Sequence, residues 1–70
     1  MDTPLILFGE NIKKNREKKG LSQEELANIA GFDRTYISLI ERGKRNLSLM
    51  NICRFAKALD LKPFELIKNI

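Results

Sequence analysis

Apolar residues recur every three to four positions along the chain, which predicts helices and no sheet. The first helix is expected to begin at Thr3-Pro4, with Thr as N-cap and Pro in the first helical position, and to stop at Gly20. Gly9 lies inside it at a cost of up to about 1 kcal/mol relative to alanine, so we expect close packing against another helix there. The apolar face of this helix comprises Leu5, Phe8 and Ile12, with Arg16 at the same spacing.

Two short helices are expected in the middle of the chain. Ser22 begins the first with a capping box, because Glu25 follows three residues later, and Gly31 ends it. Asp33 is the candidate N-cap of the second, which is expected over residues 34–42. A tight turn joins the two helices, which is the arrangement of a helix-turn-helix unit.

A fourth and a fifth helix complete the expected fold. Ser48 is the N-cap of the fourth, and Lys62-Pro63 breaks the chain and starts the fifth, expected over residues 63–70. The inner face of the fourth helix is expected to comprise Leu49, Ile52, Phe55, Ala56 and Leu59. The pattern therefore predicts an all-α protein, a bundle of five short helices that forms one domain over residues 1–70.

The second helix of the helix-turn-helix unit has an apolar face and a hydrogen-bonding face. Ile37 and Ile40 are expected to point toward the core. On the other face, an arginine can bond bidentately to guanine, a threonine methyl can contact thymine, and hydroxyl groups can reach bases or phosphates. Because such a helix enters the DNA major groove with its N-terminal end first, the candidates for base contact are Arg34, Thr35, Tyr36 and Ser38.

Cations cluster directly after that helix. Residues 34–45 hold four cations and one anion, and Arg42, Lys44 and Arg45 are placed to flank the groove and bind the DNA backbone. Gln23 stands at the N-terminus of the preceding helix, where an amide and free backbone N–H groups suit a phosphate. The alternative is a solvated face on a helical bundle, which is common for helix pairs. The clustered cations favour DNA binding over it.

Composition narrows the possible functions. The 70 residues carry 13 Lys and Arg against 9 Asp and Glu, a net charge of +4, and 43% of them are hydrophobic, as in an ordinary globular protein. Having no His and one Cys, the chain is not expected to hold a structural zinc, a His-based triad or an intramolecular disulfide. The longest apolar run, residues 4–8, is too short for a membrane span or a signal peptide. We therefore expect a cytoplasmic protein with no membrane partner.

An enzyme is not expected. Glu24 and Glu25 are adjacent on a helix, so their side chains diverge by about 100° and cannot flank one substrate. The chain has no phosphate-binding loop and too little bulk for a catalytic cleft. We expect no catalytic residue, no metal, no cofactor and no small-molecule ligand.

Three segments of the chain carry a family resemblance: Leu21-Ser22-Gln23-Glu24-Glu25-Leu26-Ala27, Tyr36-Ile37-Ser38 and Ile40-Glu41-Arg42-Gly43. They resemble the phage-repressor type of helix-turn-helix protein, also known as the XRE or Cro/C1 type. The resemblance extends from Phe8-Gly9 to the region of Leu59. It implies a five-helix, lambda-repressor-like DNA-binding domain that acts as a homodimer on palindromic operators in double-stranded DNA.

A narrower similarity connects the chain to the controller proteins of restriction–modification systems. It rests on Asp33-Arg34-Thr35-Tyr36-Ile37-Ser38, Ile40-Glu41-Arg42 and Arg45-Asn46-Leu47. It implies a regulator that controls its own gene and the endonuclease gene, activating at low occupancy and repressing at high occupancy. RNA polymerase is then a further candidate partner.

The same similarity implies roles for individual residues. Arg34 would read guanine, while Thr35, Tyr36 and Ser38 would contact bases or the adjacent backbone. Glu24 would approach a base or orient Arg34. Phosphates would be held by Gln23, Arg45 and Asn46.

The resemblance also implies a structural ion pair between Arg16, on the apolar side of the first helix, and Glu41, at the end of the third. The alternative is two independent surface charges. A pair is favoured because an unpaired charge on a buried stripe is costly. Cys53 is expected to be a small core residue.

The C-terminal helix is expected to mediate dimerisation. Leu66 and Ile70 share one of its sides with Ile67 adjacent, while Phe64 points elsewhere. These residues cannot all pack inside a domain of this size, so a symmetric homodimer is expected to cover them. The alternative is a core-packing helix with a frayed end. Asp60 departs from the family pattern, since many relatives have Gly at this position.

Two other binding functions stay open at this point. One is a stand-alone phage-type or antitoxin-like repressor. The other is a protein-interaction module on the same fold, which predicts a large apolar patch and salt-tolerant binding to a protein. The cations around the turn favour a DNA-binding function.

Overall fold

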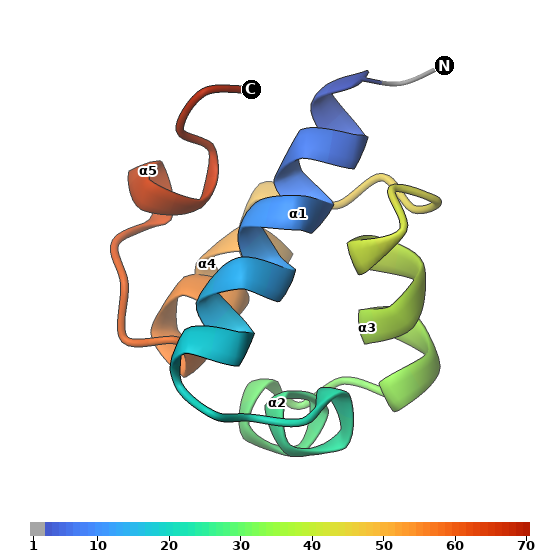
Figure 1. The fold of residues 1–70 in the computed structure, drawn as a ribbon, viewed down its shortest axis with the longest axis vertical. Helices are drawn as coiled ribbons and strands as arrows, with labels where there is room; N and C mark the ends of the chain where they lie inside the picture. The colour runs from blue at the N-terminus through green and yellow to red at the C-terminus, as the bar shows by residue number, and fades with distance from the viewer. Residues whose placement is uncertain (1–2) are drawn as a thin grey trace.

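The computed structural model describes residues 3–70, and these residues form five α-helices and no strand. In chain order the helices are α1 (Thr3–Lys18), α2 (Gln23–Ala30), α3 (Arg34–Glu41), α4 (Leu49–Ala58) and α5 (Pro63–Leu66). α1 crosses the molecule in front of α4, with α2 at the bottom, α3 at the right and α5 at the left (Figure 1). The predicted all-α fold of five helices is confirmed.

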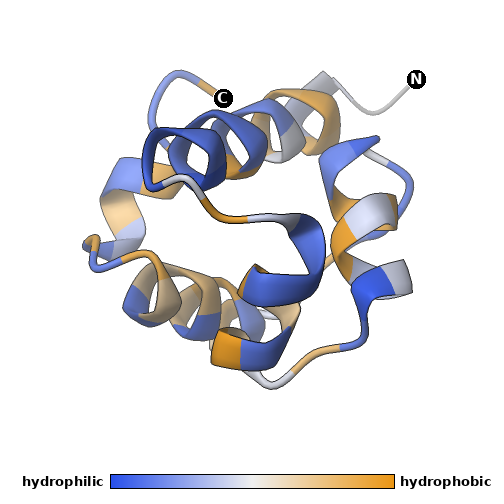
Figure 2. Ribbon diagram, turned by 60° about the horizontal axis from the view of Figure 1, so that its bottom comes forward, coloured by the Kyte–Doolittle hydropathy of each residue, from blue (hydrophilic) through white to orange (hydrophobic). Residues whose placement is uncertain are grey.

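One hydrophobic core holds the helices together. Every helix contains both hydrophobic and hydrophilic residues, as amphipathic helices around a shared core do (Figure 2). Each large apolar side chain that is fully buried contributes about 1.5–3 kcal/mol of transfer free energy. The fully buried large side chains are Ile12, Leu26, Ile37, Ile40, Phe55, Leu59 and Leu66.

The helices begin close to where the sequence predicts. The Ser22 hydroxyl accepts from the Glu25 backbone N–H (3.0 Å), and the Glu25 carboxylate accepts from the Ser22 backbone N–H (2.8 Å), so the capping box is confirmed. Ser48 likewise accepts from the backbone N–H of Asn51 (3.1 Å) at the start of α4. Asp33 occupies the N-cap position of α3, but its side chain makes no capping hydrogen bond.

The glycine inside α1 marks the closest approach between two helices. A Cβ atom built on Gly9 would collide with the carbonyl oxygen of Ile40 and would lie 2.8 Å from that of Glu41. The backbones of α1 and α3 therefore touch at a point where a side chain of any size would separate them. This is the close packing expected from the sequence.

Two predictions for α4 are wrong. Leu49, assigned to its inner face, is 72% exposed, because it is the first residue after the Ser48 cap and precedes the part of α4 that packs on the core. Cys53 is half-buried rather than a core residue. The remaining predicted inner residues, Ile52, Phe55, Ala56 and Leu59, do belong to the core or pack against it.

The C-terminal helix is shorter than expected. α5 ends at Leu66, whereas the sequence predicts a helix to residue 70. The side-chain amide of Asn11 on α1 donates to the carbonyl oxygens of Leu66 (2.8 Å) and Lys68 (3.1 Å). These bonds tie the segment at and after the end of α5 to α1, and Asn69 turns to a left-handed φ of 64°.

Leu66 also requires a correction. It is 0% exposed and belongs to the hydrophobic core of its own chain, so it has no surface to offer to a second copy. Its assignment to a dimer interface is therefore wrong, and α5 uses it to anchor itself on the bundle. Ile67 and Ile70, the other two residues of that prediction, are each 44% exposed.

Two further features of the described residues concern the turn after α4 and the lengths of the helices. Asp60 has a positive φ of 57°, so the turn after α4 does require a left-handed residue. Within residues 3–70, none of the helices is both long enough and apolar enough to cross a membrane.

Candidate nucleic-acid interface

The turn between α2 and α3 sets the direction of α3. Gly31 adopts a left-handed conformation with φ 78°, which ends α2. The backbone N–H groups of Gly31 and Phe32 both donate to the carbonyl oxygen of Ala27, at 2.9 and 2.8 Å. These bonds fold the chain back sharply, so that α3 starts within a few residues of the end of α2 and packs against it. The two helices form the predicted helix-turn-helix.

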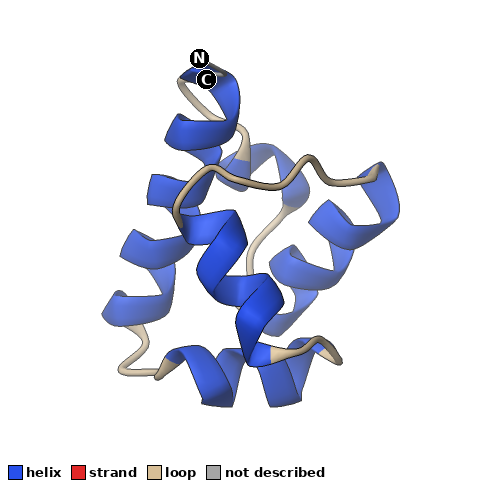
Figure 3. Ribbon diagram, turned by 90° about the vertical axis from the view of Figure 1, so that its right-hand side faces the viewer, coloured by secondary structure: helices blue, strands red, loops and turns tan. Residues whose placement is uncertain are grey.

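α3 is amphipathic, and its polar side is available to a ligand. Ile37 and Ile40 are buried at 0% and 1% exposure, whereas Arg34 and Thr35 are exposed and Ser38 is half-buried. α3 stands in front of the other helices when the molecule is viewed from its side (Figure 3). All four predicted base-contacting residues therefore lie on an outer helix of the fold, two of them exposed and two half-buried.

Tyr36, the fourth of them, is held in place by aromatic neighbours. Its ring centroid lies 4.8 Å from that of Phe32 and 6.2 Å from that of Phe55, and the ring of Tyr36 is close to parallel with that of Phe55. The side-chain amide of Asn51 donates to the Tyr36 hydroxyl at 3.0 Å. Tyr36 is thus half-buried, and its hydroxyl oxygen already has one hydrogen-bond partner within the chain.

The loop from α3 to α4 carries exposed polar and cationic side chains. The guanidinium carbon of Arg45 lies 5.4 Å from the centroid of the Tyr36 ring, which places this cation beside the polar face of α3. The Nε of Arg42 donates to the carbonyl oxygen of Ser38 at 3.3 Å. All four residues predicted to contact the DNA backbone from this loop are exposed: Arg42, Lys44, Arg45 and Asn46.

Gln23 and Glu24, at the start of α2, differ in their surroundings. The side-chain nitrogen of Gln23 donates to Glu41 at 3.0 Å, so one of its two N–H bonds is committed inside the chain. Its second N–H bond is the amide donor that remains for a phosphate. Glu24 is exposed.

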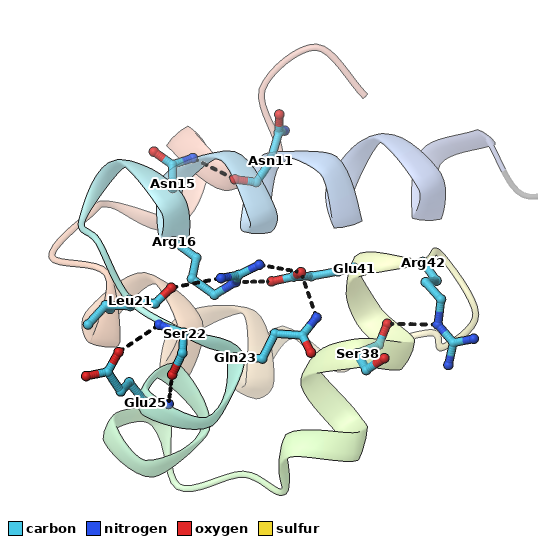
Figure 4. A network of polar contacts seen from close by, with 10 residues as sticks. All are labelled: Asn11, Asn15, Arg16, Leu21, Ser22, Gln23, Glu25, Ser38, Glu41 and Arg42. Carbon is cyan, nitrogen blue, oxygen red and sulfur yellow. Dashed lines mark hydrogen bonds and ion pairs between the residues drawn. The ribbon is translucent and has the colours of Figure 1, made fainter.

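Arg16 and Glu41 form a two-pronged ion pair beneath this surface (Figure 4). Arg16 Nε lies 2.6 Å from Glu41 Oε2 and Arg16 Nη2 lies 3.0 Å from Glu41 Oε1. Arg16 Nη1 also donates to the carbonyl oxygen of Leu21 at 2.8 Å. The two side chains are only 10% and 4% exposed, so the pair that the family resemblance implies is a buried link between α1 and the end of α3.

The surroundings of Arg16 keep its charge in place. The hydrogen bond to Glu41, together with its negative charge, raises the pKa of Arg16, although burial acts in the opposite direction. Arg16 therefore stays protonated over the whole working pH range. The pair and the Gln23 amide together tie three helices to one another around the base of α3.

Two residues of α4 that the sequence analysis missed also fix this surface. One is Asn51, through its bond to Tyr36. The other is Arg54, whose guanidinium donates to the carbonyl oxygens of Ala30 (3.0 Å) and Gly31 (2.7 Å) and lies 4.0 Å from the Phe32 ring centroid. Asn51 and Arg54 are three positions apart, so they lie on one side of α4, beside its apolar face. This spacing is the sequence signal that could have identified them.

The geometry defines the protein as a helix-turn-helix domain of the DNA-binding type, with a polar second helix presented outward and cations beside it. A helix-turn-helix family model, HTH_3, matches residues 12–66. The chain therefore belongs to the HTH_3 family of helix-turn-helix transcription regulators.

Individual relatives narrow the resemblance to controller proteins. The chain is 48% identical over 63 residues to the control protein C.BamHI of Bacillus amyloliquefaciens, covering 89% of this chain and 78% of that protein. The crystal structure of the restriction-modification controller protein C.AhdI from Aeromonas hydrophila matches with a TM-score of 0.87 and 52% identity, over 89% of this chain and 94% of that one. The controller protein C.Esp1396I, solved as a tetramer on its natural 35 base-pair operator, matches with a TM-score of 0.87 and 38% identity, over 96% of this chain and 92% of that one.

Proposed function

We propose that this protein is a restriction–modification controller protein that binds palindromic operators as a homodimer. It would regulate its own gene and the endonuclease gene, acting as a binding protein and not as an enzyme. It would work in the cytoplasm, where the operator is, and contact RNA polymerase when it activates. The similarity to C.BamHI and C.AhdI supports the controller role.

The observation that carries DNA binding is the exposed polar face of α3 with cations on the loop that follows it. Arg34 and Thr35 are exposed at the N-terminal end of α3, which is the end that enters the major groove in helix-turn-helix complexes. Arg42, Lys44 and Arg45 supply the positive charge that phosphates require. The first group suits base edges and the second suits the backbone.

The homodimer would place two copies of α3 about 34 Å apart, so that they read half-sites one DNA turn apart. Ile67 and Ile70 are our candidates for its interface, because both are apolar and partly exposed near the C-terminus.

The experiment that tests the proposed function is a footprint of the purified protein on the DNA upstream of its own start codon. It should be made at about 150 mM salt with scrambled DNA as competitor, because non-specific binding weakens steeply as salt rises. We expect protection of a palindromic site, and two adjacent dimer sites would favour the controller circuit. Retention without protection of any site would contradict the proposal and favour a protein-interaction module.

A pair of variants separates base reading from phosphate binding. Arg34→Ala is expected to cost about 1–3 kcal/mol of discrimination between operator and scrambled DNA. Arg45→Ala is expected to weaken binding to both DNAs alike and to lower the salt slope by about one unit. Lys13→Ala, an exposed cation on α1, is the matched control and should change neither quantity.

A further inference from the structure

In the hydrogen bond between Asn51 and Tyr36, the amide is the donor and the hydroxyl is the acceptor. This assignment decides whether the Tyr36 hydroxyl can donate a hydrogen bond to DNA. The amide nitrogen of Asn51 carries only donor hydrogens, so in the 3.0 Å contact the Tyr36 oxygen accepts. A tyrosine hydroxyl has one hydrogen of its own, and that hydrogen is left free to point to another acceptor.

Neither side chain is free to leave this arrangement easily. The Tyr36 ring packs against Phe32 and Phe55 with centroids 4.8 and 6.2 Å away, which fixes the position of its hydroxyl. Asn51 is the third residue of α4, where its backbone N–H is bound by the Ser48 hydroxyl at 3.1 Å. The capped start of α4 thus presents the amide to the first turn of α3.

We propose that Asn51 is a positioning residue for DNA recognition, which holds the Tyr36 hydroxyl so that it acts as a hydrogen-bond donor to the operator. The inference rests on the proposed function, because it requires α3 to lie in the major groove. A hydroxyl that donates favours bases with an acceptor at the contacted position, such as N7 or O6 of guanine or O4 of thymine. It disfavours the amino group of cytosine.

The test measures base preference rather than affinity alone. The duplex protected in the footprint is altered one base pair at a time, and binding is measured for the wild type, Tyr36→Phe, Asn51→Leu and Asn51→Asp. In the wild type, one position should prefer an acceptor base by roughly 3- to 10-fold, the value of one hydrogen bond. Tyr36→Phe should abolish that preference.

The two Asn51 variants act on the same hydroxyl in different ways. Asn51→Leu removes the amide without adding charge, so the Tyr36 hydroxyl can turn and serve as donor or acceptor. The logarithm of the fold-preference for an acceptor base should then fall to about half of the wild-type value or less. Asn51→Asp replaces the donor by an acceptor that takes the hydroxyl hydrogen, so the preference should fall further. We therefore expect base preference to decrease from the wild type to Asn51→Leu and again to Asn51→Asp.

The control is the same pair of substitutions in the Tyr36→Phe background. With no hydroxyl present, Asn51→Leu should leave base preference unchanged, and Asn51→Asp should weaken binding to every duplex alike through its charge. Thermal unfolding of each variant verifies that it is folded. An anion in the first turn of α4 is favourable to the helix dipole, so the Asp variant is expected to fold.

The inference is overturned if Asn51→Leu keeps the full preference of the wild type, or if it alters preference equally with and without the Tyr36 hydroxyl. In both cases the wild type still binds its operator specifically, and the proposed function stands. If the wild type itself shows no sequence preference, the proposed function fails and the inference fails with it.

Discussion

The helix-turn-helix side of the molecule and its C-terminal end are stabilised by different means. α3 is held by the buried Arg16–Glu41 pair, by backbone contact with α1 at Gly9 and by the packing of two fully buried isoleucines. α5 has four residues and one buried side chain, Leu66. It leaves Phe64, Ile67 and Ile70 exposed at 63%, 44% and 44%.

This difference shows which part of the molecule is complete within one chain. The position of α3 depends on contacts inside the bundle, which one chain supplies by itself. The C-terminal end retains apolar surface that a second copy would cover in the proposed homodimer. Substitutions that break contacts inside the bundle should therefore lower the free energy of unfolding, whereas substitutions of the exposed apolar residues near the C-terminus should weaken association.

The largest effect is expected from Glu41→Ala. It leaves the Arg16 guanidinium buried without its counter-charge, and breaking a buried pair in this way costs about 3–5 kcal/mol of unfolding free energy. Urea denaturation measures it, with the exposed Glu10→Ala as control. The double variant Arg16→Met, Glu41→Leu should be more stable than Glu41→Ala. If Glu41→Ala and Glu10→Ala cost the same, the pair has no structural role.

At the C-terminal end, Leu66→Ala is expected to lower the unfolding free energy by about 2–5 kcal/mol, because it leaves a cavity in the core. Ile67→Ser and Ile70→Ser should leave the unfolding free energy of the monomer nearly unchanged. They should instead weaken self-association, as sedimentation over a range of concentrations measures. Equal loss of stability in all three variants would contradict the distinction between anchor and interface.

The next effect concerns the contact between α1 and α3. Gly9→Ala should cost about 1–3 kcal/mol of unfolding free energy, because its methyl group meets carbonyl groups of the α3 backbone, which cannot rotate away. The better helix propensity of alanine offsets up to about 1 kcal/mol of this cost. Thermal unfolding measures the sum. A variant as stable as the wild type would show that the two helices can separate freely.

The smallest effect is a pH dependence at the cap of α2. The hydrogen bonds from the Ser22 backbone and side chain lower the pKa of Glu25, so its stabilising effect is present above the ordinary value near pH 4.3 and is lost as the pH falls through the lowered pKa. The difference in Tm between the wild type and Glu25→Gln should therefore shrink on acidification from pH 7 to about pH 3. Glu24→Gln is the control, and a constant difference would contradict the assignment.

Local sequence signals predicted the helix starts well because their cause is local. The Ser22 capping box, the Ser48 cap and the left-handed Gly31 each involve residues within one turn of a helix. The helix-turn-helix and its exposed Arg34 follow from the same kind of signal. The burial of Leu66 and the exposure of Leu49 do not. Leu49 has the spacing of an inner-face residue although it is exposed, and Leu66 has the same spacing as the exposed Ile70 although it is buried.

The order of residues along the chain was enough to predict where the helices begin, which residues form most of the core and which polar groups lie on the outer face of α3. Periodicity and capping act over a few residues, so they are readable without a fold. The packing of the helices, by contrast, established that Asn11 binds the carbonyl oxygen of Leu66, that Asn51 reaches Tyr36 and that Arg54 holds the turn. These contacts join residues from 15 to 55 positions apart, and no local pattern encodes which of them will meet.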